Sequence, residues 1–89
     1  MFVVVEHAIT DPGASLRLSQ KPPKHPPGIK ALQFFPSTSS DRAVCLWEAK
    51  SLEAVKSFLE PLSAKASRNT YYGVDSTKAM GLPTVASAA

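Results

Sequence analysis

The stretch RAVCLWEA, residues 42–49, alternates in a way that decides how the rest of the chain is organised. As a β-strand, it places Val44 and Leu46 on one face of a sheet and Cys45 and Trp47 on the other. The first pair is ordinary core material. A thiol beside the only tryptophan on the opposite face also needs cover, because such a surface is too apolar to leave in water. The stretch therefore predicts a sheet with apolar side chains on both faces.

The first part of the chain predicts a strand, a short helix and a loop. Residues 2–9, FVVVEHAI, are β-branched and apolar, which favours a buried strand. Asp11 followed by Pro12 is a helix-start signal, with the aspartate as N-cap, so we expect a helix over residues 12–20. The proline-rich segment KPPKHPPG, residues 21–28, predicts an extended loop, because each proline removes a hydrogen-bond donor and restricts the residue before it.

The second part predicts a hairpin, a helix and a last strand. Residues 29–35, IKALQFF, favour a strand that a turn, PSTSSD, connects to the strand at 42–48. The period then changes from two to near 3.6, with Ser51 as a plausible N-cap and Pro61 expected to end or kink the helix. The apolar stripe of this helix consists of Leu52, Val55, Phe58, Leu59 and Leu62. Residues 69–75, NTYYGVD, predict the fourth strand, and one helical turn is expected after it.

The resulting order, βαββαβ, is typical of the ferredoxin-like α+β fold. In that fold a four-stranded antiparallel sheet carries both helices on one face, and the other face is bare. We expect a single domain over residues 1–83 and a flexible tail over 84–89.

Alternation along the strands sorts their side chains into two sets. The set expected to face the helices comprises Phe2, Val4, Leu32, Phe34, Val44 and Leu46. The set expected on the bare face comprises Val3, Val5, His7, Ala31, Gln33, Phe35, Cys45, Trp47 and Tyr72 or Tyr71. Because this second set is also apolar, we expect a second copy of the chain to cover it, forming a homodimer through the sheet faces.

The chain resembles the small dimeric α+β barrel proteins, in which two ferredoxin-like subunits pack sheet to sheet. The segments VVVEHAI, CLWEAKSLEAVKSFLEP and NTYYGVD carry the resemblance, which covers about residues 1–83 and is strongest to uncharacterised bacterial members. The resemblance implies a homodimer. It does not imply one activity, because this architecture hosts cofactor-independent monooxygenases, isomerase-like enzymes, haem-degrading relatives, regulatory ligand-binding domains and stress proteins.

Composition limits the function classes. Hydrophobic residues make up 44% and charged residues 19% of the 89, a balance typical of a globular chain. The net charge of +3 comes from basic residues gathered in a proline-rich segment without a nucleic-acid-binding signature, so no nucleic-acid partner is expected. No apolar run is long enough to span a bilayer, and a cytoplasmic location without a membrane partner is expected. One cysteine cannot form an internal disulfide or a zinc framework.

The bare-face set predicts a pocket of mixed character, which we expect to bind a small molecule. Its lining is predicted to be His7, Gln33, Phe35, Cys45, Trp47 and Tyr72. His7 is the candidate acid/base, although a strand-end histidine is often merely satisfied by a neighbour. Gln33 needs a hydrogen-bond partner if buried. Cys45 is either an inert small hydrophobe or a nucleophile, and Trp47 either stacks a flat ligand or fills the seam between subunits.

Neither a metal site nor a cofactor is expected, since His7 and Cys45 alone supply too few ligands and no phosphate-binding loop is present. The sequence therefore favours a homodimeric ligand-binding or stress-associated module. The alternative is a cofactor-independent monooxygenase- or isomerase-like enzyme acting on a small aromatic or polyketide-like compound, with His7 as acid/base. Whether the protein is an enzyme stays open at this point.

Overall fold

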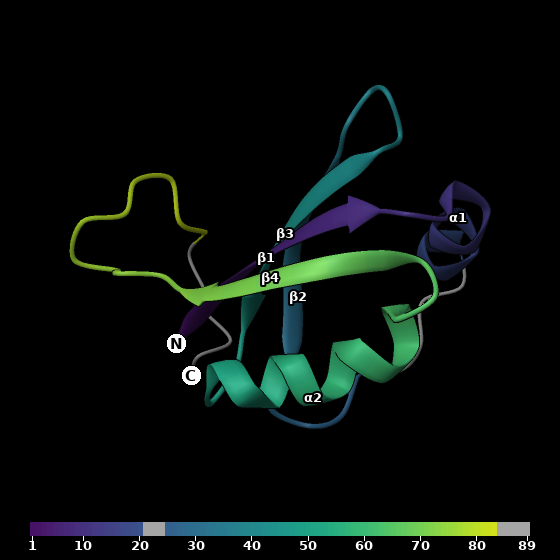
Figure 1. Cartoon of the computed structure of the whole chain (residues 1–89). Coiled ribbons are helices and arrows are strands. Elements are labelled where there is room, and N and C mark those ends of the chain that lie inside the picture. Colours follow the sequence, from purple (N-terminus) through teal and green to yellow (C-terminus); the bar gives the residue numbers. More distant parts are fainter. Residues whose placement is uncertain (21–24, 84–89) are drawn as a thin grey trace.

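The computed structural model describes residues 1–20 and 25–83, and it has the predicted order of elements (Figure 1). The elements are strand β1 (Phe2–Ile9), helix α1 (Pro12–Gln20), strand β2 (Lys30–Pro36), strand β3 (Arg42–Glu48), helix α2 (Leu52–Ser63) and strand β4 (Ser67–Gly73). The strands form one antiparallel sheet in the order β2-β3-β1-β4, with β1 and β3 in the middle. This is the ferredoxin-like α+β fold.

Both helices begin at the predicted caps. The Asp11 Oδ1 atom accepts a hydrogen bond from the Ala14 backbone N–H at 3.1 Å, and Ser51 Oγ accepts one from Ala54 N–H at 3.1 Å. These side chains satisfy backbone donors that a first helical turn leaves unpaired. Helix α2 continues through Pro61 to Ser63, a longer course than the proline predicts. Pro61 has no N–H to donate to the carbonyl of Ser57, and the helix ends two residues after it.

The fourth strand begins and ends two residues earlier than predicted, at Ser67 and Gly73. It begins early because Ser67 pairs with Ile9 at the end of β1. The expected helical turn after this strand is a single turn, held by backbone hydrogen bonds from Lys78 and Ala79 to the Asp75 carbonyl. Residues 21–24 of the expected loop and the expected tail at 84–89 lie outside the described residues.

The core lies between the sheet and α2, which runs beneath the sheet in Figure 1. Its buried members are Val3, Val5, Cys45, Trp47, Ala49 and Val55, and the partly buried side chains packed against them include Leu52, Phe58, Leu59 and Tyr71. Leu52, Val55, Phe58 and Leu59 belong to the predicted stripe of α2, so the helix presents the expected side chains to the sheet. We call this side of the sheet the covered face.

The assignment of the two strand sets to the two faces was wrong for β1 and β3. Val3, Val5 and Cys45 pack beneath α2, whereas Val4 and Val44 lie on the opposite side of the sheet, which we call the open face. The physical reason is that charged and polar side chains lie on the same face as Val4 and Val44. Cross-strand pairing places Glu6 and Thr70 in the row of Val44, and it places Arg42 and Arg68 in the next row of the same face, on either side of Ala8. Burying those groups beneath a helix would cost several kcal/mol.

Strand β2 departs from simple alternation because it contains a bulge at Leu32. Ala31 pairs with Trp47, but Gln33 pairs with Leu46, so one extra residue is inserted between them. A bulge of this kind moves every following side chain to the other face. Phe34 therefore shares the row of Cys45 on the covered face, and Phe35 shares the row of Val44 on the open face.

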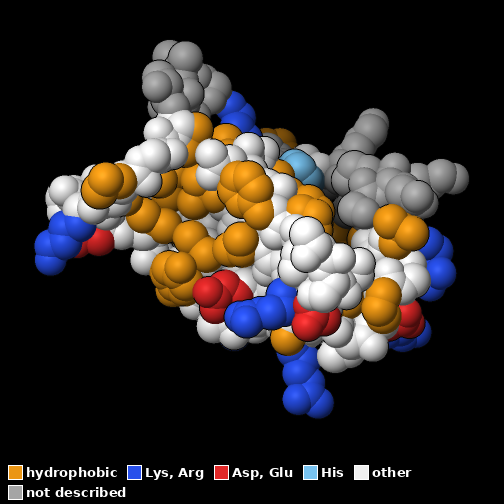
Figure 2. All heavy atoms as spheres, turned by 90° about the horizontal axis from the view of Figure 1, so that it is seen from above, with side chains coloured by type: hydrophobic (Ala, Val, Ile, Leu, Met, Phe, Trp, Pro, Cys, Tyr) orange, Lys and Arg blue, Asp and Glu red, His pale blue; other side chains and the backbone are white. Residues whose placement is uncertain are grey.

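The open face is apolar at its centre. Seen from the side away from α2, hydrophobic side chains gather over the sheet and charged side chains lie around them (Figure 2). Phe35 is 58% exposed and Tyr72 is 47% exposed. Leu46 is buried even in the single chain, and it lines a groove together with Leu82 from the segment that follows β4.

Candidate functional site: a cavity beneath the sheet

A cavity of about 350 Å³ lies on the covered face, between the sheet and the two helices. Its wall is largely apolar, and its size falls at the lower end of the range of small-molecule sites. Helix α1 contributes Ser15 and Leu18, and α2 contributes Phe58, Leu59 and Leu62. The remaining lining comes from Ser63 at the end of α2, from His25 and Ala66 outside the helices and strands, and from the strands with His7, Ala31, Gln33, Phe34, Ala43, Cys45, Trp47 and Ser67.

Three aromatic rings gather at one part of the cavity wall. The centroid of the His25 ring lies 5.1 Å from that of Trp47 and 5.5 Å from that of Phe58. Trp47 and Phe58 are themselves 6.0 Å apart in an edge-on arrangement. These distances lie within the range of favourable ring contacts, so the three rings form a joined wall that can stack a flat molecule.

A thiol and an imidazole meet at the polar part of the same wall. His7 Nε2 lies 3.1 Å from Cys45 Sγ, and His7 Nδ1 lies 2.6 Å from Asn69 Oδ1. The indole Nε1–H of Trp47 donates a hydrogen bond to the same sulfur at 2.9 Å. The cysteine therefore contacts two polar groups in an otherwise apolar environment.

The sheet register explains this meeting. His7 on β1 is directly opposite Ala43 on β3 and Asn69 on β4. Cys45 is paired with Val5, so it is the diagonal neighbour of His7, at a separation that a long side chain can bridge. Because Ala43 has a small side chain, it leaves room for the imidazole beside it.

Asn69 connects the imidazole to a carboxylate and a phenol. Its Nδ2 donates to Glu60 Oε2 at 2.9 Å and to Ser63 Oγ at 2.6 Å. The Tyr71 hydroxyl donates to the same Glu60 oxygen at 2.6 Å. Hydrogen bonds therefore run without interruption from Cys45 through His7 to helix α2. We call Cys45, His7, Asn69, Glu60 and Tyr71 the polar relay.

Burial and these contacts shift several pKa values. Burial raises the pKa of the Cys45 thiol to about 11, although the Trp47 hydrogen bond acts in the opposite direction. Burial lowers the pKa of His7, an effect that the bond to Asn69 partly offsets. The pKa of Tyr71 is raised, first by burial and then by its bond to Glu60, and hydrogen bonds from Tyr71 and Asn69 lower the pKa of Glu60. At neutral pH the thiol and the imidazole are therefore both uncharged.

The described part of the chain contains no group of three or more His, Cys, Asp or Glu side chains placed to hold a metal ion. His7 and Cys45 are close enough to share one, but two ligands do not make a stable site.

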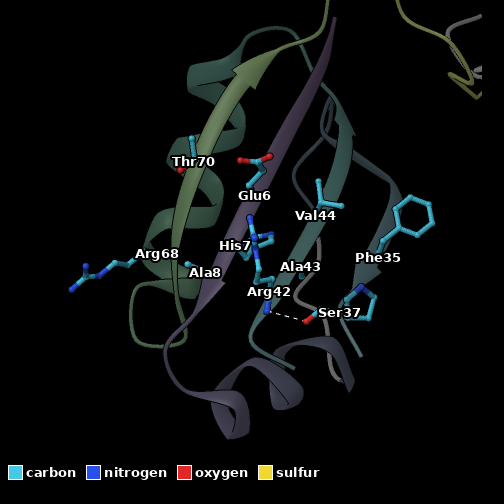
Figure 3. A pocket seen from close by; sticks show the side chains of 11 residues that line it. Glu6, His7, Ala8, Phe35, Ser37, Arg42, Ala43, Val44, Arg68 and Thr70 are labelled. Atoms are coloured by element: carbon cyan, nitrogen blue, oxygen red, sulfur yellow. Dashed lines mark hydrogen bonds between the residues drawn. The ribbon is translucent and has the colours of Figure 1, made fainter. Parts of the chain in front are cut away.

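A second hollow, of about 510 Å³, lies on the open face at the end of β1 (Figure 3). Glu6 lies between Thr70 and Val44 in this view, and Arg68 extends outward from β4. The turn before β3 is held here by a hydrogen bond from the Arg42 backbone N–H to Ser37 Oγ at 3.1 Å. This hollow is more polar than the cavity beneath the sheet and has no comparable apolar wall, so the covered cavity is the better candidate for a small molecule.

The six predicted site residues are divided between the two faces. His7, Cys45 and Trp47 lie together on the covered face and line the cavity. Phe35 and Tyr72 lie on the open face and line hollows there, so their inclusion in one pocket with the others was wrong. The bulge in β2 separates Phe35 from the cavity. Tyr72 is separated because Tyr71, not Tyr72, pairs with Val5 on the covered face.

Gln33 lies beside the bulge and lines both the cavity and the open-face groove. Its side chain has no hydrogen bond to another described residue, so it is available to a bound molecule.

Sequence reasoning missed Asn69, Glu60 and His25. Asn69 could have been found by pairing β1 with β4 in the register that places Tyr71 opposite Val5, because that register brings Asn69 opposite His7. Glu60 carried no such signal, since it depends on the angle at which α2 crosses the sheet. His25 belongs to the segment predicted as an extended loop; it is exposed, but its ring packs on Trp47 and Phe58.

Comparison with known proteins finds no matching family model, no matching curated protein and no matching solved structure. In residues 1–20 and 25–83, none of the helices has the length and apolar character needed to cross a membrane. The geometry of the cavity is therefore the guide to function.

Proposed function

We propose that the protein is a small binding module that takes up a flat, apolar molecule with one hydrogen-bonding group in the cavity beneath the sheet. The observation that supports the proposal is that aromatic rings and polar groups line the same cavity. Trp47, Phe58 and His25 offer ring faces and edges, and His7 and Gln33 offer polar groups in the same cavity. Small-molecule sites are generally built in this way, with a few polar groups orienting the ligand inside an apolar enclosure.

The proposal is tested by measuring the thermal stability of the protein with and without 1-naphthol, a flat molecule with one hydroxyl group. At a concentration ten times its Kd, a ligand adds roughly 1.4 kcal/mol to the free energy of unfolding, which raises the Tm of a domain of this size by about 5–10 °C. Leu62→Trp fills part of the cavity from α2 and is expected to abolish the shift. Ser57→Trp is the matched control, because Ser57 is exposed on the same helix and does not line the cavity.

A shift in the wild type and in Ser57→Trp, but not in Leu62→Trp, supports the proposal. Equal shifts in all three proteins contradict it, because binding would then occur elsewhere. The absence of a shift in the wild type, for 1-naphthol and for larger aromatic phenols, also contradicts it.

We further propose that two copies associate through their open faces. The support is a surface that is apolar at its centre and carries charges of both signs. Glu6 lies beside the row that holds Arg42 and Arg68, and none of these side chains forms an ion pair within the described residues. A two-fold axis between these rows would bring Glu6 of each copy over the small Ala8 of the other, between the two arginines. The face can therefore offset its own charges in a dimer.

Light scattering tests the association. The wild type is expected to have about twice the chain mass of 9.5 kDa at micromolar concentration. Phe35→Glu, which adds a charge at an exposed apolar position of the open face, is expected to give the monomer mass, whereas Ser57→Glu on α2 is expected to stay dimeric. A monomeric wild type, or a dimeric Phe35→Glu, would rule out this interface.

A further inference from the structure

Cys45, His7 and Asn69 are arranged as a nucleophile, a base and a group that orients the base. The sulfur is 3.1 Å from His7 Nε2, and the other imidazole nitrogen is 2.6 Å from Asn69 Oδ1. Both distances are those expected when a side chain activates a neighbouring nucleophile and is itself held by a third group. The three residues come from three adjacent strands, so the arrangement is supported by the rigid part of the fold.

The hydrogen bonds around Asn69 determine which imidazole nitrogen carries the proton. Asn69 Nδ2 faces Glu60 and Ser63, and a reversed amide would point its oxygen at the Glu60 carboxylate. Asn69 Oδ1 therefore faces the imidazole, where it also accepts a bond from Ser67 Oγ at 2.7 Å. It follows that His7 Nδ1 carries the proton and donates it to Asn69, and that the lone pair of Nε2 faces Cys45.

Before the reaction, the Cys45 thiol and the His7 imidazole are both uncharged. Burial raises the thiol pKa and lowers the imidazole pKa, so neither ion is formed in advance. A thiol of this kind reacts when a neighbouring base removes its proton during the attack. The Trp47 N–H, 2.9 Å from the sulfur, stabilises the negative charge that develops there.

We propose that Cys45 is a catalytic nucleophile that accepts the acyl group of an apolar ester or thioester bound in the cavity, with His7 as general base and Asn69 as the positioning residue. This proposal rests on the cavity of the proposed function and adds a reaction to it. It differs from the monooxygenase- or isomerase-like alternative, which has His7 as acid/base and assigns no nucleophile.

The reaction needs no reactant other than the ester or thioester and water. The Cys45 sulfur forms a bond to the carbonyl carbon while its proton passes to His7 Nε2. The bond from that carbon to the leaving oxygen or sulfur then breaks, and the leaving group takes the proton from Nε2. Water attacks the resulting thioester with His7 again accepting a proton, and the sulfur leaves and recovers its proton.

The cavity indicates the class of acyl group and a donor for the carbonyl oxygen. Leu18, Leu59 and Leu62 favour an aliphatic or aromatic acyl chain and disfavour a charged one. Gln33 and His25 line the same cavity, and neither side chain has a hydrogen bond to another described residue. Either can donate to the oxygen on which charge develops, which is a major contribution in acyl transfer.

The test uses p-nitrophenyl butyrate, with release of p-nitrophenolate and the intact mass of the protein as readouts. The wild type is expected to gain one butyryl group, and a peptide map is expected to place it on Cys45, the single cysteine. Cys45→Ala is expected to gain none. His7→Gln, which preserves volume, is expected to slow acylation by about 100-fold, the typical contribution of a general base.

The pH profile separates catalysis from a structural role. The wild-type rate is expected to reach half its plateau below pH 6.5, because the pKa of His7 is lowered from that value. In His7→Gln the rate is expected to rise only from pH 9 toward 11, as the thiol ionises by itself. Asn69→Ala is expected to slow acylation and to move the midpoint to lower pH, since its hydrogen bond raises the pKa of His7.

The same proteins distinguish failure of this proposal from failure of the proposed function. If 1-naphthol binds but the ester acylates no residue, or acylates a serine or lysine, the nucleophile proposal is wrong and the binding module stands. An acylation rate that is unchanged in His7→Gln also overturns it. If acylation of Cys45 occurs and Leu62→Trp does not slow it, the cavity is not the acyl site and the inference fails with the proposed function.

Discussion

The two faces of the sheet are built from similar strand residues, yet they have different physical roles. The covered face buries its apolar side chains beneath α2 and includes a polar relay whose members satisfy one another. The open face leaves Phe35 and Tyr72 exposed and carries Glu6, Arg42 and Arg68 without ion pairs among the described residues. Apolar content alone therefore does not determine which face becomes the core. Charged residues on the same rows do, because they cannot follow the apolar ones beneath a helix.

The largest expected difference between the faces is in the cost of removing an aromatic ring. Trp47→Ala is expected to lower the free energy of unfolding by about 3–5 kcal/mol, because the side chain is 5% exposed and its loss leaves a cavity. Phe35→Ala is expected to cost less than about 1 kcal/mol in the monomer, since that ring is more than half exposed. Urea denaturation at low protein concentration measures both. Equal costs would mean that the assignment of the faces is wrong.

Replacing one polar residue on each face with an apolar residue is a second test of the difference between the faces. Asn69→Leu is expected to cost roughly 2–3 kcal/mol, because it leaves His7 and Glu60 without their partner in the polar relay. Its neighbour Thr70 is exposed on the open face, so Thr70→Val is expected to change stability by no more than about 0.5 kcal/mol. Denaturation of the two variants under the same conditions gives the difference, and a small cost for Asn69→Leu would show that the relay is not tightly coupled.

The buried groups of the covered face are also expected to make the free energy of unfolding depend on pH, with losses at both acid and alkaline pH. The folded-state pKa of His7 is below 6.5, so the unfolded chain binds more protons there, and stability is expected to fall as the pH drops below 6.5. The folded-state pKa of Cys45, about 11, is above its ordinary 9.0, so stability is expected to fall as the pH rises from 9 toward 11.

Two variants show which residue causes each loss of stability, the one at acid pH and the one at alkaline pH. In His7→Gln the fall below pH 6.5 should be reduced, and in Cys45→Ala the fall that begins at pH 9 should be reduced. Some alkaline loss is expected to remain in Cys45→Ala, because the pKa of Tyr71 is raised as well. Profiles that are identical in wild type and both variants would contradict the burial of the pair.

The smallest expected effect lies outside both faces, in the β2–β3 turn. Ser40 has a φ of 63°, a left-handed conformation that costs a non-glycine residue about 1–2 kcal/mol. Ser40→Gly removes that cost but adds freedom to the unfolded chain, so a net gain of about 0.5 kcal/mol is expected. Thr38→Gly, in the same turn but without a positive φ, should instead lose stability. A loss in Ser40→Gly equal to that in Thr38→Gly would show that the turn is not strained.

Much of the fold was predictable because its signals are local. The β-branched run at 2–9 and the caps Asp11 and Ser51 correctly indicate where β1, α1 and α2 begin. Of the candidate site, His7, Cys45 and Trp47 were correctly expected on one face, since alternation follows directly from the pleat of a strand. Their partners were not predictable in the same way, because Asn69 and Glu60 reach His7 only through pairing and packing over long sequence distances.

Three features follow from the sequence alone: the order of the elements, the apolar stripe of α2 and which residues within β1 and β3 share a face. Those features depend on the backbone period and on nearest neighbours. Three other features depend on the packing of the whole chain: which face α2 covers, where β2 bulges and that the Cys45 thiol meets the His7 imidazole. These depend on a free-energy comparison between whole arrangements, in which burying Glu6 and Arg42 on one side costs more than burying Cys45 and His7 on the other.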